Sequence, residues 1–269
     1  MNFNKYKTLS NQYDVSFGKS EYRKSLKRLL LKKTKSLGRS SGQIVMWHRG
    51  GGVKRNFRPI LNYKNAVDNY AILRSIEYDP NRSAFIGLIQ YKTGVFANIV
   101  VSSSSKVGDI MSFNLNNNQF RKNGDFLKLR YAPIGIPIYN LEKYPNSGPV
   151  YSKAAGGYSI LLTKDLNYGK VRLPSGDERL FDLNCLVTIG TPSNIYNRFN
   201  KNYKAGTSRL LNKRPIVRGV AMNPIDHPHG GGAGKTAPGR PSVSPWGKLT
   251  KGVPTRDKTL KNKFIVKKN

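Results

Sequence analysis

The chain has 269 residues, 38% of them hydrophobic, and a formal net charge of +33 from 47 basic and 14 acidic side chains. A chain with this much self-repulsion requires a polyanionic partner, and nucleic acid is the commonest polyanion able to neutralise dozens of charges. The single Cys185 excludes an internal disulfide, and one cysteine with three histidines excludes the usual structural zinc patterns, so we expect no metal and no cofactor.

The charge is concentrated at the two ends. Residues 1–40 carry 11 basic and 2 acidic side chains and residues 201–269 carry 16 and 2, against 20 and 10 in residues 41–200. No apolar run approaches the roughly 18 to 20 residues needed to span a bilayer, and the opening MNFNKYKTLS lacks the apolar core of a secretory signal. We therefore expect no membrane partner, no export, and basic arms at both ends.

The first arm, residues 1–37, contains the stretch KSEYRKSLKRLLLKKTKSL at 19–37, whose Tyr22, Leu26, Leu29 and Leu30 fall near one helical face. Three interpretations stay open here: an amphipathic targeting or membrane-surface helix, a basic arm that becomes ordered on RNA, or a solvated helix. We favour the RNA arm because the rest of the chain already requires an anionic partner.

From Gly42 the pattern changes to short strands. Turn chemistry at Asp79-Pro80-Asn81 and Lys92-Thr93-Gly94 separates apolar runs at hairpin spacing. The expected strands are residues 43–48, 70–78, 83–91 and 95–102. They predict a small closed barrel of the oligonucleotide-binding (OB) type within residues 38–122.

A second set of strands, in residues 123–200, begins near Asp125 and predicts a second small barrel. Pro174-Ser175-Gly176 predicts a tight turn, and Cys185 lies in an apolar strand, as a buried structural thiol does. The expected strands after the glycine-rich connection are residues 159–163, 169–175, 178–183 and 185–190. A short helix is expected at residues 193–201, followed by a basic, irregular tail at 201–269.

The tail contains GAGKT, which suggests a phosphate-binding loop. The pattern G-x-x-x-x-G-K-[ST] requires glycine at position 229, which is His229, and Ala237-Pro238-Gly239 follows where a helix is needed. The sequence therefore argues against a nucleotide hydrolase.

Cations surround the glycine triplet in HRGGGVKRNFR, residues 48–58. Arg49, Lys54, Arg55 and Arg58 can bind a phosphate backbone, and Phe57 offers a stacking face. Triple glycine also lets the backbone lie flush against an anionic surface, with its N–H groups free to bind phosphate oxygens. Because no helix or ribbon suited to a DNA major groove is evident, the loop predicts contacts with folded RNA.

His227 and His229 invite a catalytic interpretation because imidazole titrates near neutrality. No serine or cysteine nucleophile is placed by spacing, and two histidines alone do not complete a metal site. We expect no catalytic residue, and we expect Trp246 to act as a packing anchor on a partner.

Four segments carry a family signature: HRGGGVKR (48–55), IEYDPNRSA (76–84), KRPIVRGVAMNPIDHPHGGGAGK (213–235) and SPWGKLTKG (244–252). They resemble the universal large-subunit ribosomal protein family L-two, over about residue 38 to the C-terminus. The resemblance implies an OB-like barrel followed by an SH3-like barrel, with the tail inserted into large-subunit ribosomal RNA near the peptidyl-transferase region. It also implies a structural, non-enzymatic role, contacts with other ribosomal proteins, help in association with the small subunit, and no small-molecule substrate.

The expected RNA-binding residues combine positions matched to the family with cations and the tryptophan of the same segments. They are Arg49, Gly50, Gly51, Gly52, Lys54, Arg55, Arg58, Arg82, Arg209, Arg214, Arg218, Asn223, His227, His229, Gly230, Gly231, Gly232, Lys235, Arg240, Trp246 and Lys248. The chain departs from the family pattern at Val53, Ala233 and Leu210, which affects individual contacts rather than the resemblance.

The abundant asparagine and the lysine-rich front end resemble a mitochondrial version of the family, with a plastid or bacterial cytoplasmic version as the alternative. Two other functions remain as hypotheses. One is a general RNA-packaging or RNA-chaperone protein that binds many RNAs in a salt-sensitive way. The other is a histidine-dependent phosphate-ester hydrolase.

Overall fold

The computed structural model describes residues 29–32, 37–61, 66, 68–113, 122–234, 239–253 and 264–267. The chain divides into two compact units. The first, here called the β unit, comprises Met1–Thr34, Arg55–Lys201 and Lys263–Asn269. The second, here called the loop–tail unit, comprises Lys35–Lys54 and Asn202–Asn262.

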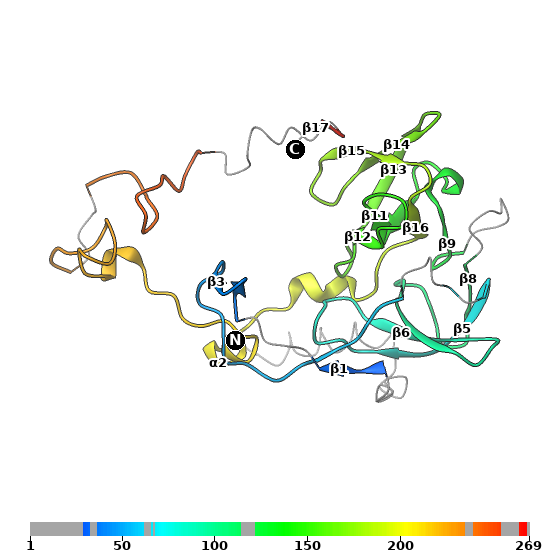
Figure 1. Cartoon of the computed structure of the whole chain (residues 1–269), viewed down its shortest axis with the longest axis horizontal. Helices are drawn as coiled ribbons and strands as arrows, with labels where there is room; N and C mark the ends of the chain where they lie inside the picture. The colour runs from blue at the N-terminus through cyan, green and yellow to red at the C-terminus, as the bar shows by residue number, and fades with distance from the viewer. Residues whose placement is uncertain are drawn as a thin grey trace, which may run out of the picture. The chain divides into compact units, whose positions relative to one another are not determined.

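The described part of the β unit contains two larger antiparallel sheets and two small strand pairs (Figure 1). The first sheet has the order β7-β6-β5-β8, formed by β5 (Tyr70–Glu77), β6 (Ile86–Tyr91), β7 (Phe96–Val100) and β8 (Ile110–Ser112). Gly94 donates its N–H to the Tyr91 carbonyl (3.0 Å) in the turn between β6 and β7, which confirms the hairpin expected at that position. A separate pair joins β1 (Leu31–Lys32) to β4 (Asn56–Phe57).

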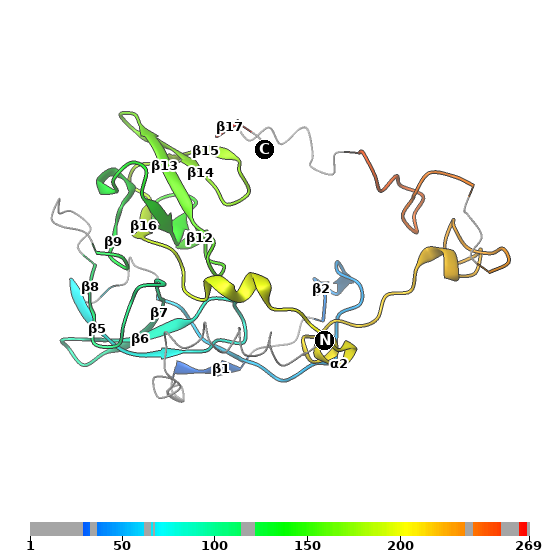
Figure 2. The same cartoon turned by 180° about the vertical axis from the view of Figure 1, so that it is seen from behind.

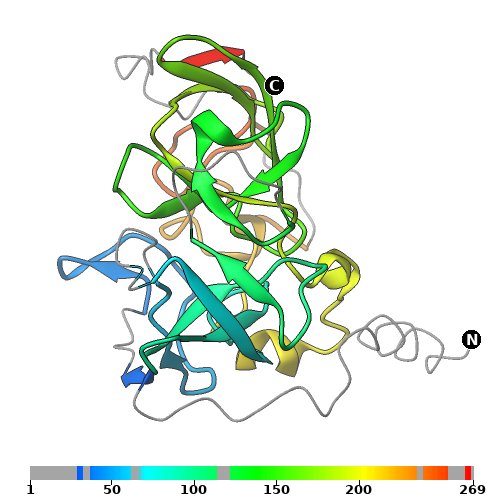
Figure 3. The ribbon, with the colours of Figure 1, turned by 90° about the vertical axis from the view of Figure 1, so that its right-hand side faces the viewer.

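The second sheet has the order β17-β15-β14-β13-β10-β16-β9 (Figure 2). Its strands are β9 (Phe126–Lys128), β10 (Pro137–Tyr139), β13 (Ser159–Lys164), β14 (Tyr168–Arg172), β15 (Glu178–Asp182), β16 (Leu186–Ile189) and β17 (Ile265–Lys267). β17 forms one edge, where it pairs with β15 (Figure 3). The turn expected at Pro174-Ser175-Gly176 is confirmed, since Gly176 N–H donates to the Leu173 carbonyl (2.9 Å).

Three apolar clusters fill the described part of the β unit, and two of them draw on both sheets, the smaller of these being Ala84, Val100 and Tyr139. The first contains Leu73, Ile89 and Ile99 and also Phe126 from β9, which stacks on Phe113 with ring centroids 4.7 Å apart. The second lies within the larger sheet and contains Leu161, Phe181 and the buried thiol of Cys185, among others. Burial of this apolar surface is the main favourable term in the folding of the unit.

Residues 191–194 connect the two sheets. Ser103 donates its N–H to the Thr191 carbonyl (2.9 Å), and Ser193 donates its N–H to the Val101 carbonyl (2.9 Å). The Ser193 hydroxyl oxygen accepts the Phe85 N–H (3.1 Å). The two β segments are therefore held together by hydrogen bonds as well as by the shared cluster.

A buried carboxylate stabilises the small pair β11 (Leu141–Glu142) and β12 (Pro149–Tyr151). Glu142 is fully buried, and its side-chain oxygens accept three backbone N–H bonds. The donors are Asn146 (3.2 Å), Gly148 (2.9 Å) and Leu186 (2.9 Å). These bonds fix the loop from 142 to 148 against β16, because a buried charge is tolerated only when it is hydrogen-bonded.

The remaining described elements are short. They are β2 (Arg39–Ser40), β3 (Gln43–Ile44), η5 (Leu129–Tyr131), η6 (Ile195–Phe199), α2 (Ala205–Leu210) and η7 (Gly219–Ala221). The fold class is all-β, as predicted, and it has the sheet content expected of an OB-like unit followed by an SH3-like unit. The helix expected at residues 193–201 is present as the 3-10 helix η6.

Three expectations about the elements need correction. The strand expected at 43–48 ends at Ile44, because the Val45 and Met46 amides both turn back to the Gly38 carbonyl (2.9 and 3.0 Å). The helix expected at 19–37 falls mostly outside the described residues, but Leu31–Lys32 is a strand paired with β4. The tail, expected to be irregular, contains the helix α2.

Candidate nucleic-acid interface

The loop that carries the first glycine triplet lies against the start of the tail, beside α2 (Figure 2). Arg49 and Lys213 form an antiparallel bridge between the two segments. Three backbone hydrogen bonds extend it: Gly50 N–H to Asn212 O (3.1 Å), Val53 N–H to Leu210 O (3.2 Å) and Arg214 N–H to His48 O (2.9 Å). Two candidate RNA-binding stretches far apart in sequence are thus one structural unit.

Glycine is required in this triplet by close packing against the tail. Gly52 has φ +63°, and a Cβ built there would contact the Asn212 side chain and lie 2.8 Å from the Asn212 backbone nitrogen. A Cβ on Gly51, at φ +76°, would lie 3.2 Å from a guanidinium nitrogen of Arg209. The expectation that the triplet keeps its N–H groups free for phosphate is wrong for Gly50, which is buried and bonded within the protein.

The second glycine triplet closes a compact turn in the NPIDHPHGGG block. Gly230 donates its N–H to the His227 carbonyl (2.8 Å), and Gly231 donates its N–H to the Met222 carbonyl (3.1 Å). A Cβ on Gly230 would contact the Asn223 carbonyl, so only glycine fits at this approach. The block is therefore a folded loop closed by its own backbone hydrogen bonds.

The two histidines of this block hold the loop together. His227 is 8% exposed, and its Nδ1 accepts the backbone N–H of His229 (3.0 Å). His229 Nε2 accepts the backbone N–H of Val243 (2.9 Å), which anchors the next segment of the tail. Burial lowers the pKa of His229, and the neighbouring His227 and Arg240 lower it further.

The same hydrogen bonds limit the ability of His227 and His229 to act as catalytic bases. A neutral imidazole has one acceptor nitrogen, and in both His227 and His229 that nitrogen is occupied by a backbone N–H. Neither ring has a second acceptor with which to remove a proton from a substrate. The geometry assigns both histidines a structural role.

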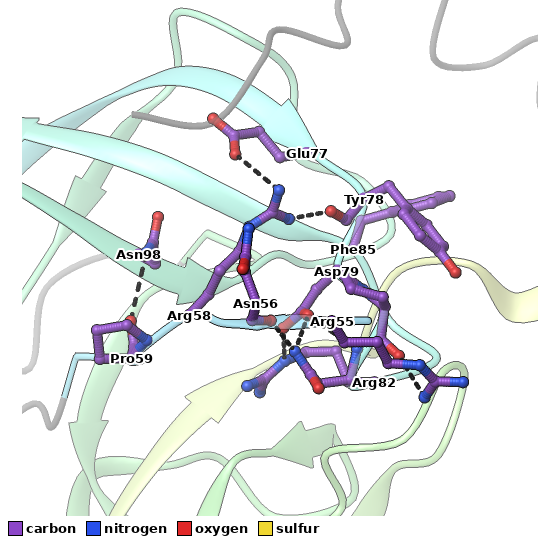
Figure 4. Close-up of polar contacts among 12 residues, drawn as sticks. Arg55, Asn56, Arg58, Pro59, Glu77, Tyr78, Asp79, Arg82, Phe85 and Asn98 are labelled. Carbon is purple, nitrogen blue, oxygen red and sulfur yellow. Dashed lines mark hydrogen bonds and ion pairs between the residues drawn. The ribbon is translucent and has the colours of Figure 1, made fainter. Parts of the chain in front are cut away.

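Three candidate arginines of the β unit surround the Asp-Pro-Asn turn, and each is bonded to a protein acceptor (Figure 4). Arg82 Nε lies 2.7 Å from Asp79 Oδ2, and Arg58 Nη2 lies 3.9 Å from Glu77 Oε2. Arg55 Nη1 donates to the Pro80 carbonyl (3.0 Å). The turn fixes the directions of these side chains, and the two carboxylates neutralise part of their charge.

Burial raises the pKa of the Glu77 carboxyl, while the charge of Arg58 and a hydrogen bond from Ser75 lower it. Asp79 is fully buried and accepts the Asn81 N–H (2.9 Å) as well as the Arg82 guanidinium. Asp79 therefore shapes the turn in the way expected of an Asx turn.

Lys153 is a cation of this region that the sequence analysis missed. Burial lowers its pKa, and the charge of Arg82 lowers it further. The Ser83 hydroxyl accepts the Ala155 N–H (3.0 Å), which holds the 152–157 segment beside the turn. No sequence pattern connects the glycine-rich SKAAGG stretch with Arg82, so only the fold identifies the pair.

The candidate residues differ in exposure. The exposed ones are Gly51, Lys54, Arg209, Arg214, Arg218, Asn223, Gly232, Arg240, Trp246 and Lys248. Half-buried ones are Arg49, Gly52, Arg55, Arg58, Arg82, His229, Gly230 and Gly231. Gly50 and His227 are buried, and Lys235 lies outside the described residues.

The part of the chain that the structure describes contains no reactive cysteine, no cluster of metal ligands and no helix able to span a membrane. Burial first, and then Glu142 and Asp182, raise the pKa of the Cys185 thiol to about 12, so it is not an activated nucleophile. No group of three or more His, Cys, Asp or Glu side chains there is arranged to hold a metal ion. The same residues include no helix long and apolar enough to cross a membrane.

A strongly basic all-β chain, with a loop–tail unit that holds several cations and with arginines fixed around a turn, has the features of an RNA-binding protein. Comparison with known families gives the assignment within that class. The model "Ribosomal Proteins L2, RNA binding N-terminal domain" matches residues 26–112, and "Ribosomal Proteins L2, C-terminal domain" matches residues 122–247.

Individual relatives agree with these matches. "Large ribosomal subunit protein uL2" of Orientia tsutsugamushi is 43% identical over 265 residues, covering 97% of this chain and 96% of that protein. "Large ribosomal subunit protein uL2m" of Reclinomonas americana is 46% identical over 245 residues, covering 90% and 88%. "Large ribosomal subunit protein uL2" of Rickettsia bellii is 47% identical over 237 residues, covering 87% of this chain and 86% of that protein.

The chain belongs to the ribosomal protein L2 family. It is accordingly a structural, non-enzymatic ribosomal protein that binds RNA.

Proposed function

We propose that this protein is a constituent of the large ribosomal subunit that binds large-subunit ribosomal RNA and contacts neighbouring ribosomal proteins. The observation that carries the proposal is the loop–tail unit, in which the 48–54 loop and the 209–214 segment are joined by backbone hydrogen bonds. This joining brings Arg49, Lys54, Arg209 and Arg214 into one basic unit. Several arginines and lysines held together suit a folded RNA, where phosphates from different strands converge.

The proposed RNA-binding residues are the set expected from sequence, with Lys153 added. The exposed members have polar groups available for phosphate and base contacts. The fixed members, such as Arg58 and Arg82, position the surface and supply less net charge, because each is paired with a carboxylate. His227 and His229 hold the NPIDHPHGGG loop and the Val243 segment together through their hydrogen bonds, and we propose no chemical step for them.

We further propose the four-part division into a basic extension (1–37), an OB-like barrel (38–122), an SH3-like barrel (123–200) and a basic tail (201–269). In the subunit, the tail would support the RNA around the peptidyl-transferase centre and help association with the small subunit. The asparagine-rich composition and the likeness to the Reclinomonas americana uL2m protein support a mitochondrial ribosome.

Gradient sedimentation of tagged protein from an organelle extract tests this function, with sequencing of the co-migrating RNA before and after a high-salt wash. We expect co-migration with large-subunit RNA that resists the wash, because a shape-specific contact is buried in the particle. Release to the top of the gradient together with mixed RNAs would refute the proposal and favour a general RNA chaperone, whose binding depends on charge alone.

A further inference from the structure

The two tryptophans of the chain lie together on the loop–tail unit. The sequence contains two tryptophans, Trp47 and Trp246, and their ring centroids lie 6.0 Å apart with planes inclined at 63°. Both are exposed, Trp47 at 58% and Trp246 at 68%. A pair of large aromatic side chains left this open to water marks a surface that another molecule covers.

Hydrogen-bonded turns fix the backbone near both tryptophans. Trp47 follows the β2–β3 hairpin, which is closed by the Val45 and Met46 amides on the Gly38 carbonyl. Trp246 lies in a tight turn in which Gly247 donates its N–H to the Ser244 carbonyl (2.9 Å). Two short, hydrogen-bonded turns therefore carry the tryptophan pair, which lowers the entropic cost of ordering the pair on a ligand.

The charge of the segments that carry the two rings points to an anionic occupant. The two described segments that carry the rings, residues 37–54 and 239–253, contain no aspartate or glutamate. Their cations are Arg39, Arg49, Lys54, Arg240, Lys248 and Lys251. Arg49 Nε lies 3.0 Å from the Met46 sulfur, which places a guanidinium at the residue next to Trp47.

Edge-to-face geometry leaves ring faces open. Because the planes meet at 63°, neither indole covers the other face to face. Nucleobases stack on such faces, while the surrounding cations bind the phosphates on either side. We propose that Trp47 and Trp246 form a stacking platform for an unpaired RNA base.

This inference rests on the proposed function, since it assigns a base-binding subsite to an RNA-binding protein. It adds Trp47, which no motif in the sequence indicated, and it changes the role of Trp246 from a general packing anchor to half of a base-binding pair.

Tryptophan fluorescence reports on the platform directly, because both tryptophans of the full-length chain belong to it. The probes are a short single-stranded oligoadenylate and an abasic ribose-phosphate oligomer of the same length, which carries the same charge without bases. We expect the oligoadenylate to quench the emission and the abasic oligomer to bind without quenching. Equal quenching by both oligomers would overturn the proposal.

Substitutions supply the second arm of the test. Trp47→Ala with Trp246→Ala should weaken oligoadenylate binding by about 5- to 150-fold for one stacked base. The slope of affinity against salt should not change, because the same phosphates are neutralised. The matched control, Trp47→Phe with Trp246→Phe, keeps aromatic faces and should retain most of the affinity.

Three results would overturn the platform. The first is unchanged affinity in the double alanine variant, and the second is an equal loss for the abasic oligomer. The third is emission that shifts only when other ribosomal proteins are added, which would indicate a protein occupant. In each of these cases co-sedimentation with large-subunit RNA can persist, so the platform can fail while the proposed function stands.

Discussion

Replacing Gly52 with alanine should detach the glycine loop from the tail. Gly52 has φ +63°, and the new Cβ would lie 2.8 Å from the Asn212 backbone nitrogen. The left-handed conformation costs an L-residue about 1–2 kcal/mol. Relief of the contact with Asn212 requires the segments to separate, which breaks at least one hydrogen bond worth about 0.5–1.5 kcal/mol.

The expected loss of local stability is therefore about 1.5–3.5 kcal/mol in the loop–tail unit. Hydrogen exchange of the Gly50 and Val53 amides measures it, since both donate across the joint. Gly42→Ala is the matched control, because Gly42 has φ +80° in the nearby β2–β3 hairpin and a Cβ added there would meet no atom within 4 Å. Unchanged protection of Gly50 and Val53 in Gly52→Ala, or an equal loss in Gly42→Ala, would refute the reasoning.

Three further predictions follow from buried or bonded groups. Folding lowers the pKa of His229 below its ordinary 6.5. The contribution of this imidazole to stability is therefore complete above pH 6.5 and is lost as the pH falls through the lowered pKa. An NMR titration of the imidazole with a midpoint at or above 6.5 would contradict this prediction. Glu142→Gln should lower the free energy of unfolding, measured in urea, by about 2–4 kcal/mol. An amide offers one acceptor oxygen to three backbone N–H groups, and each unsatisfied donor costs about 1–3 kcal/mol. A change below about 0.5 kcal/mol, typical of surface sites, would argue against the buried hydrogen bonds of Glu142. Cys185, with its pKa raised to about 12, should react with a thiol reagent at pH 8 only after denaturant is added, and rapid labelling of the native protein would contradict its burial.

The strands of the β unit were largely predictable from local patterns. Alternating apolar residues and turn chemistry located β5, β6, β7 and the strands from β13 to β16, because period-two patterning and glycine or proline turns are local properties of the chain. The same patterns failed at residues 45–48, where two amides turn back to Gly38, a contact that no periodicity encodes. The helix α2 was missed because six residues are too few to establish a helical period.

The sequence by itself determined the polyanionic partner, the family and the residue types available for RNA, since charge and motifs are written along the chain. Tertiary structure decided which of those residues act together. It paired the glycine loop with Asn212, bound Arg58 to Glu77, placed the segment of Lys153 beside that of Arg82 and brought Trp47 to Trp246. These relations join residues distant in sequence through backbone hydrogen bonds and packing, which depend on the folded path of the chain rather than on any local pattern.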